Sequence, residues 1–234
     1  MPRISVVIPA LNEEKYIGKT LEGLKKQTFK DFEIIVADAS STDNTRKIAE
    51  AYAKVVVHHK KGAAGGRNEG AKVAKGDIIV FVDADTVPSD TLLDAYNKAF
   101  TDNIVAATGP ILPLEKTGFG VRLGYKFVSD YLVRLSILIN KDSIIGSNFA
   151  VKKSIFDKIG GFDEKFLTYE DLDLSLKLRK YGRIAFVKRA MIYASARRIT
   201  KWGMSKYFLY HTGNMVRYNL TKKPKSDYDT ELIR

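Results

Sequence analysis

Apolar runs alternate with helical patterns along the first half of the chain. Four short runs are apolar enough to be buried strands, and they cover residues 4–9, 32–38, 54–59 and 77–85. Apolar residues recur every three or four positions elsewhere, which predicts helices over 14–27, 40–53, 65–74 and 89–100. Strands that alternate with helices indicate a mostly parallel sheet with helices on both faces.

The second half of the chain has a less regular pattern. Strands are predicted within 104–113 and 144–153 and at the short apolar runs IAFV and MIYAS. Helices are predicted over 118–140, 169–182 and 201–221. The first of these carries a row of charged residues four positions apart, which we expect to face solvent. The row consists of Arg122, Lys126, Asp130 and Arg134.

Polar residues follow the predicted strands of the first half. Pro9–Asn12 come after the first strand, Asp38 ends the second, and Arg67 lies on the helix after the third. Asp83 and Asp85 come at the end of the fourth. Ligands of such sheets bind outside the carboxyl ends of the strands. We therefore expect these four clusters to converge on one edge of the sheet and to form one composite site.

The two aspartates after the apolar run IIVFV are the most informative of these residues. Carboxylates at the end of a buried strand are costly unless a positive group meets them. On a strand, Asp83 and Asp85 would face the same side and could aim at one point. Their hard oxygen atoms suit Mg²⁺ or Mn²⁺. A capped turn would also explain two aspartates, so the pair alone leaves both interpretations open.

Composition and charge narrow the class of protein. There is no cysteine, which excludes disulfides and thiolate metal sites. The net charge is +12, and residues 188–234 hold eleven basic residues against three acidic ones. Nucleic acid, anionic lipid or a phosphorylated substrate would each explain that excess. No apolar run approaches the ~20 residues that span a bilayer, and the N-terminus does not resemble a signal peptide. We expect a cytoplasmic protein that is soluble or peripheral.

Six motifs carry a resemblance to a known family. In chain order they are PALNEE (9–14), VADASSTDNT (36–45), GRNEG (66–70), FVDADT (81–86), GSNFAVKKSIFDKIGGFDE (146–164) and YEDLDLSLKLRKYG (169–182). Each is weak alone, but their order is specific, and the chain resembles the family 2 glycosyltransferases up to about residue 200. Within that family it is similar to dolichol-phosphate-mannose synthase-like and archaeal or bacterial single-sugar transferases. The QxxRW motif of processive members is absent, which favours transfer of a single sugar.

The resemblance implies a GT-A fold, which is an α/β fold with a Rossmann-like, mostly parallel central sheet flanked by helices. It implies one catalytic domain over 1–222. A nucleotide-sugar-binding half would cover 1–109, and a smaller acceptor-binding half would cover 110–200. A basic aromatic helix would follow over 201–222, and residues 223–234 would form a loose tail.

The resemblance assigns most of the clustered residues to a nucleoside-diphosphate sugar donor. Asp85 is expected to ligate Mn²⁺ or Mg²⁺ on the donor diphosphate, with Asp83 as a second ligand or as a contact to the ribose. Asp38 would read the base, although Ala37 replaces the first acid of the usual Asp-Asp-Gly. Further expected contacts to the donor and its sugar are Pro9, Ala10, Leu11, Glu13, Arg67, Ala84, Gly146, Ser147, Asn148 and Arg197.

Catalysis is expected in the second half of the chain. Asp171 would act as the base that takes the proton of a sugar hydroxyl while that hydroxyl attacks the anomeric carbon, which inverts the centre. Glu170 precedes it, and Arg198 beside Arg197 would stabilise the leaving diphosphate. Capping of a helix is the alternative explanation for Glu170 and Asp171. A lipid phosphate acceptor would need no base.

The expected donor is GDP-mannose or otherwise a UDP-sugar, and the expected acceptor is a lipid-linked sugar, a lipid phosphate or a glycan. The segment 201–222 suits either a peripheral contact with the cytoplasmic face of a membrane or packing on the domain. Two other functions stay open. A sugar-nucleotide nucleotidyltransferase would show a glycine-rich loop after the first strand, which is missing here. A nucleic-acid-binding module would fit the basic charge, but the clustered acids oppose it, and we expect no nucleic acid.

Overall fold

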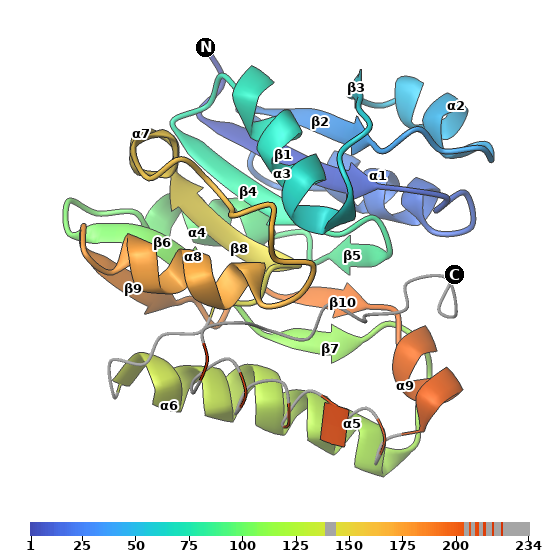
Figure 1. Ribbon diagram of the computed structural model, residues 1–234, viewed down its shortest axis with the longest axis vertical. Coiled ribbons are helices and arrows are strands. Elements are labelled where there is room, and N and C mark those ends of the chain that lie inside the picture. Colours follow the sequence, from blue (N-terminus) through green and yellow to red (C-terminus); the bar gives the residue numbers. More distant parts are fainter. Residues whose placement is uncertain are drawn as a thin grey trace.

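The computed structural model describes residues 1–138 and 144–203, together with six single helical residues further on (Figure 1). Those six are Lys206, Leu209, Tyr210, Gly213, Arg217 and Thr221. The strands are β1 (Ile4–Ala10), β2 (Phe32–Asp38), β3 (Lys54–Val57), β4 (Ile78–Val82), β5 (Thr86–Pro88), β6 (Ile104–Thr108), β7 (Ile111–Pro113), β8 (Asn148–Lys152), β9 (Arg183–Phe186) and β10 (Ile192–Ala194). They form a large sheet in the order β3-β2-β1-β4-β8-β6-β9 and a small sheet in the order β5-β10-β7.

The first four strands of the chain pair in parallel, as their continuous apolar runs predict. β1 lies between β2 and β4, with Ile4 opposite both Phe32 and Ile78. β8 runs antiparallel to its neighbours β4 and β6. The carboxyl ends of β1, β2 and β4 therefore meet at one edge, where the chain places its polar clusters.

Helices cover both faces of the large sheet. They are α1 (Ile17–Lys25), α2 (Thr45–Glu50), α3 (Gly62–Val73), α4 (Leu92–Ala99), α7 (Lys153–Lys158) and α8 (Glu170–Leu178). Alternate residues of β1 and β4 point to opposite faces. Ile4, Val6 and Ile8 pack with buried residues of α1, α2 and α4, whereas Val7 packs with those of α3, α7 and α8. The mixed α/β prediction is confirmed.

Some predicted helices begin later than their apolar pattern indicates. The helix predicted over 40–53 begins only at Thr45. The side chains before it hold the loop instead, since Ser41 donates a hydrogen bond to Asp38 and Asp43 accepts one from the Thr45 backbone. Short polar side chains that bind nearby backbone favour such turns over helix.

Helix α3 shows a different departure from the prediction. It begins at Gly62, so Gly65 and Gly66 lie inside the helix and not in a loop before it. A side chain at Gly70 would overlap Val7 Cγ1, and one at Gly66 would come within 3.0 Å of Pro9 Cβ. The glycines are thus explained by the close approach of α3 to β1.

The two halves of the chain share both sheets. β5 comes from the first half but pairs with β10 in the small sheet, and β8 from the second half inserts beside β4. The predicted helix over 118–140 appears as α5 (Phe119–Lys126), a π-helical segment η1 (Phe127–Leu132) and α6 (Val133–Leu138). Figure 1 shows these three as one long helix beyond the small sheet.

The chain after β10 differs from the prediction. The helix predicted to begin at residue 201 begins earlier, because Arg197 and Arg198 open the short helix α9 (Arg197–Trp202), which is followed by Gly203 with φ +78°. Most of the segment 204–222 and all of the tail 223–234 lie outside the described residues. Within the described part of the chain, no helix is long and apolar enough to cross a membrane.

The close contact between α3 and β1 gives a stability prediction. Gly70→Ala forces a methyl group into Val7 and is expected to lower the free energy of unfolding by about 1–3 kcal/mol. Gly18→Ala in α1 is the matched control, because its nearest neighbour would be 3.8 Å away; helix propensity then favours alanine by up to about 1 kcal/mol. Urea denaturation of both variants measures the two signs, and a Gly70→Ala protein as stable as the wild type would contradict the packing argument.

Candidate functional site

The turn Asp83–Ala84–Asp85 connects β4 to β5 and lies at the centre of the site. β4 ends at Val82, so the two aspartates do not sit on one face of a strand. The Thr86 backbone N–H donates to the Asp83 carbonyl, and Thr20 Oγ1 of α1 donates to the Ala84 carbonyl at 2.7 Å. These two hydrogen bonds hold the turn in place, and each carboxylate contacts a different arginine.

Arg67 of α3 is the first of these arginines, and only 3% of its side chain is exposed. Its Nη2 lies 2.9 Å from Asp83 Oδ1, and its Nη1 lies 2.6 Å from Glu170 Oε1. A side chain on Gly146 would come within 3.1 Å of the same guanidinium group. The absence of a side chain at Gly146 thus leaves space for Arg67, and the expected contact of Gly146 with the donor or its sugar stays a prediction.

Glu170 and Asp171 open α8, directly after Tyr169, whose φ is +66°. The Gly146 backbone N–H donates to Asp171 Oδ2 at 2.9 Å, and the Leu172 N–H donates to Asp171 Oδ1 at 2.8 Å. The helix start thereby brings two carboxyl groups to the buried Arg67.

Burial dominates the electrostatics of this cluster. Burial, together with the neighbouring charge of Asp171, raises the pKa of Glu170 to about 7, although Arg67 acts in the opposite direction. Burial also raises the pKa of Asp171, against the lowering effects of the Gly146 N–H and of Arg67. Burial alone would lower the pKa of Arg67, but Asp83 and Glu170 outweigh it and raise that pKa. A carboxyl group poised near neutral pH is typical of catalytic sites.

Arg197 of α9 is the second arginine. Its two terminal nitrogens bind the Glu13 carboxylate at 2.9 and 2.6 Å, and Nη2 also lies 3.0 Å from Asp85 Oδ2. Its guanidinium group lies 4.6 Å from the centre of the Tyr16 ring. The loop after β1 and the turn after β4 are therefore joined through one cation from the far end of the chain.

Glu115 fixes the helix that presents Arg197. Its carboxylate accepts hydrogen bonds from Ser195 Oγ at 2.8 Å and from the Ala196 backbone at 2.7 Å. Although burial alone would raise the pKa of Glu115, these hydrogen bonds hold it below its usual value. Sequence reasoning missed Glu115. The signal that could have found it is an acidic residue at the end of an apolar segment, outside every predicted motif.

Asp38 ends β2 and has no exposed surface. Its carboxylate accepts hydrogen bonds from the Ser41 backbone at 3.1 Å and from Ser41 Oγ at 2.5 Å. Ser40 beside it has φ +60°, and Asn12 in the loop after β1 has φ +54°. With Tyr169, these are the non-glycine residues of positive φ within the described chain. All three flank the site, and such strain is characteristic of functional loops.

Several other predicted residues have structural contacts. Asn148 is fully buried; its Oδ1 accepts a hydrogen bond from the Tyr96 hydroxyl at 2.7 Å, and its Nδ2 donates to the Ala190 carbonyl. These bonds satisfy polar atoms of Asn148 within the protein, and its contact with the donor or its sugar stays a prediction. Ala10 and Ala84 are buried, and Ser147 is half-buried. Pro9 and Leu11, also half-buried, lie where β1 ends. The side chain of Arg198 lies outside the described part of the structure.

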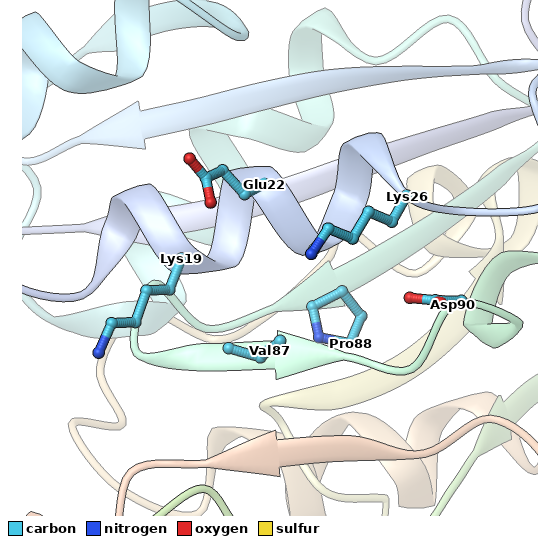
Figure 2. Close-up of a pocket in the computed structure, with 7 residues that line it drawn as sticks. Lys19, Glu22, Lys26, Val87, Pro88 and Asp90 are labelled. Atoms are coloured by element: carbon cyan, nitrogen blue, oxygen red, sulfur yellow. The ribbon is translucent and has the colours of Figure 1, made fainter.

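A separate pocket lies between α1 and β5, away from these clusters (Figure 2). It has a volume of about 280 Å³ and mixed charge at its rim. Its lining consists of Lys19, Glu22, Gly23, Lys26, Val87, Pro88 and Asp90. None of the predicted site residues lines it, and it carries no argument for function.

Comparison with known proteins identifies the family. The family model described as "Glycosyl transferase family 2" matches residues 5–160, which is more than half of the chain. The chain belongs to glycosyltransferase family 2. The family predicted from the six motifs is thus confirmed.

Curated relatives of this family 2 chain are matched over different shares of their own length. It is 27% identical to "Amylovoran biosynthesis glycosyltransferase AmsB" of Erwinia amylovora, over 92% of the chain and 75% of the relative. It is 28% identical to "GalNAc(5)-diNAcBac-PP-undecaprenol beta-1,3-glucosyltransferase" of Campylobacter jejuni, over 71% of the chain and 56% of the relative. A relative from Streptococcus pneumoniae, "Glycosyltransferase GlyG", is matched over only 33% of its length. The chain thus spans a third to three quarters of these proteins.

Solved structures of two glycosyltransferases share the fold. Mannosyltransferase PcManGT from Pyrobaculum calidifontis, solved with GDP-Man and Mn²⁺, matches with a TM-score of 0.69 and 19% identity, over 99% of the chain and 68% of that protein. S. aureus TarS 1–349, solved with UDP-GlcNAc, matches with a TM-score of 0.67 and 23% identity, over 83% and 58%. The predicted GT-A fold is confirmed for this family 2 chain.

The carboxylates of the central turn fit a divalent metal that is completed by a ligand. In the residues that the structure describes, no three histidine or acidic side chains gather as a complete metal site. Mg²⁺, however, is usually held by one or two carboxylates together with substrate phosphates and water. Asp85 offers hard oxygen atoms beside the partly exposed Arg197, whereas Asp83 is bound to the buried Arg67. Asp85 is the better fit of the two.

The raised pKa of Glu170 predicts how stability depends on pH. The group has an ordinary pKa of 4.5 and a folded-state pKa of about 7, so folding favours its protonated form. Its stabilising contribution is complete below pH 4.5 and is lost as the pH rises towards 7. Glu170→Gln is expected to flatten the fall in thermal stability across this range, while the exposed Glu50→Gln should leave the slope unchanged. Equal slopes for wild type and Glu170→Gln would contradict the prediction.

Proposed function

We propose that the chain is an inverting, metal-dependent glycosyltransferase that moves one sugar from a nucleoside-diphosphate sugar to a lipid-linked or glycan acceptor. The observation that carries the proposal is the turn Asp83–Ala84–Asp85, held between Arg67 and Arg197 opposite the carboxyl groups of Glu170 and Asp171. This arrangement joins a place for a diphosphate to a place for a base.

Charge balance supports the need for a metal. The two arginines are surrounded by the carboxyl groups of Glu13, Asp83, Asp85, Glu170 and Asp171. Even with Glu170 protonated, acids outnumber these two cations, so a diphosphate would be repelled. Asp85 would hold a divalent ion, which would neutralise the diphosphate and stabilise it as a leaving group.

Asp171 is the proposed base. It takes the proton of the acceptor hydroxyl as the oxygen forms a bond to the anomeric carbon, and the bond from that carbon to the diphosphate breaks on the opposite side. Its raised pKa makes it a better proton acceptor than an ordinary aspartate. Hydrogen bonds from the backbone of Gly146 and Leu172 orient the carboxylate. The positive charge of Arg67 reduces the electrostatic repulsion between the carboxyl groups of Asp171 and Glu170.

The proposed donor carries uracil or guanine, because Asp38 can accept a hydrogen bond from the ring N–H of either base once its loop adjusts around Ser41. We rank GDP-mannose first and UDP-sugars second. The fold shared with a GDP-Man complex supports the first, and the complex of TarS with UDP-GlcNAc supports the second. The name of the C. jejuni relative includes PP-undecaprenol, which supports a lipid-linked acceptor.

A thermal-shift screen tests donor and metal together. GDP-mannose, UDP-glucose, UDP-GlcNAc and dTDP-glucose are each added with and without Mn²⁺. We expect one of them to raise the melting temperature, by several degrees at saturating ligand, and only with the metal present. Asp85→Ala should abolish this shift because it removes the proposed ligand. Asp94→Ala, which removes a half-buried carboxylate paired with Lys98, is the matched control. Stabilisation by no nucleotide would overturn the proposed function.

Asp171→Asn separates the base from donor binding. It keeps the shape of the side chain and one of its two hydrogen-bond acceptors but removes its basicity. Transfer to a hydroxyl acceptor is expected to fall by about 10²–10⁴-fold, while the thermal shift with donor and metal stays. Asp173→Asn, two positions further along the same helix and paired with Lys177, is the control. Unchanged turnover of Asp171→Asn would exclude the base role and favour an acceptor that is already ionised, such as a lipid phosphate.

A further inference from the structure

The long helix formed by α5, η1 and α6 exposes large apolar side chains on its outer side. Five of them lie four positions apart and have between 41% and 83% of their surface exposed. This outer stripe consists of Phe119, Leu123, Phe127, Tyr131 and Leu135. The Phe127 and Tyr131 rings stack with their centres 5.5 Å apart. A contiguous apolar row of this size on a surface helix marks an interaction site.

The opposite side of the same helix is fixed to the domain. Ser129 is buried; its hydroxyl donates to the Ile111 carbonyl at 2.8 Å and accepts from the Ile111 N–H at 3.1 Å, which joins η1 to β7. Val133 is buried one turn further on. Phe127 and Tyr131 each lie two positions from Ser129, which is about half a turn of a helix, and both side chains are exposed. The outer stripe therefore faces away from the fold.

Basic residues run along one flank of the outer stripe. Arg122 and Lys126 are exposed and directly precede Leu123 and Phe127 in sequence. Asp130, the acid on the same flank, is paired with Arg134 at 2.9 Å, so the flank keeps a net positive charge. Our expectation of a simple solvated charged stripe covers only this flank and misses the apolar row beside it.

We propose that the outer stripe is a docking surface for the plane of an anionic lipid membrane. An apolar face with aromatic side chains and a basic flank is the composition of helices that lie in a membrane interface. A second copy of the chain fits less well, because a symmetric contact would bring two positive flanks together. The inference concerns a surface outside the proposed catalytic site and does not depend on the proposed function.

The outer stripe is also placed close to the site along the chain. Phe119 follows Glu115 by four residues, a reach of at most ~14 Å, and Glu115 holds the start of the helix that carries Arg197. A membrane bound at the Phe119 end of the outer stripe would therefore lie near Glu115 and the start of α9.

Vesicle flotation with the full 234-residue chain tests the proposal. Vesicles of phosphatidylcholine with phosphatidylglycerol are compared with phosphatidylcholine alone, at low salt and at 0.5 M salt. We expect binding to the anionic vesicles that weakens with salt. Leu123→Ser/Phe127→Ser should weaken it at least about tenfold, because two apolar side chains no longer enter the interface. Leu176→Ser/Tyr181→Ser, exposed apolar residues on another face, should bind as the wild type does.

A second pair of variants tests the basic flank. Arg122→Glu/Lys126→Glu should abolish the preference for anionic vesicles, whereas Lys47→Glu/Lys54→Glu, with the same change in net charge, should keep it. Circular dichroism and the donor thermal shift check that all variants are folded. The proposal is overturned if the wild type does not float, or if the Leu123→Ser/Phe127→Ser variant floats like the wild type. It is also overturned if the wild type does not bind vesicles but forms a dimer in sedimentation, and if the Leu123→Ser/Phe127→Ser variant is a monomer.

Discussion

The buried ion pairs of Arg67 determine the geometry of the whole site. A guanidinium group with 3% exposure is tolerable only when its charge is matched, and Asp83 and Glu170 match it from two elements far apart in sequence. Removing either partner would leave an unbalanced charge in a poorly hydrated place. The turn after β4 and the start of α8 are therefore fixed relative to α3, and every other contact of the site is built around that frame.

Arg197 differs from Arg67 in a way that matters for function. Its side chain is more exposed, and it comes from a helix that Glu115 attaches by two hydrogen bonds. Its partners Glu13 and Asp85 are the residues that a donor and its metal would contact under the proposed function. Under that proposal, Arg67 has a structural role, whereas Arg197 can exchange its protein carboxylate partners for the donor diphosphate. Carboxylates and diphosphates both present anionic oxygen atoms, which a guanidinium group binds in the same way.

The sequence predicted the parts of this structure that depend on local pattern. The buried runs at β1, β2 and β4 and the family motifs are visible in the chain itself, and with them the edge of the sheet where polar residues gather. It did not predict partners. Nothing local in the sequence shows that the missing side chain of Gly146 leaves space for Arg67. Nothing local shows either that Asn148 forms hydrogen bonds with Tyr96 and Ala190. Glu115 belongs to none of the predicted motifs, because it can bind the start of α9 only after β10 has paired with β7. Such contacts join segments far apart in sequence, and periodicity carries no information about them.

Separation of charge explains how a strongly basic chain can contain an acidic site. The excess of Lys and Arg suggests nucleic acid when it is taken as one number, but the acids are concentrated at the ends of β1 and β4 and at the start of α8. The basic residues beside the outer stripe lie instead on a helix outside the small sheet, which Ser129 holds in place. Under the proposed function, the acidic site would bind a metal together with a diphosphate, whereas a basic exterior attracts anionic surfaces. The two charges would then have different partners, and the net value of +12 describes neither of them.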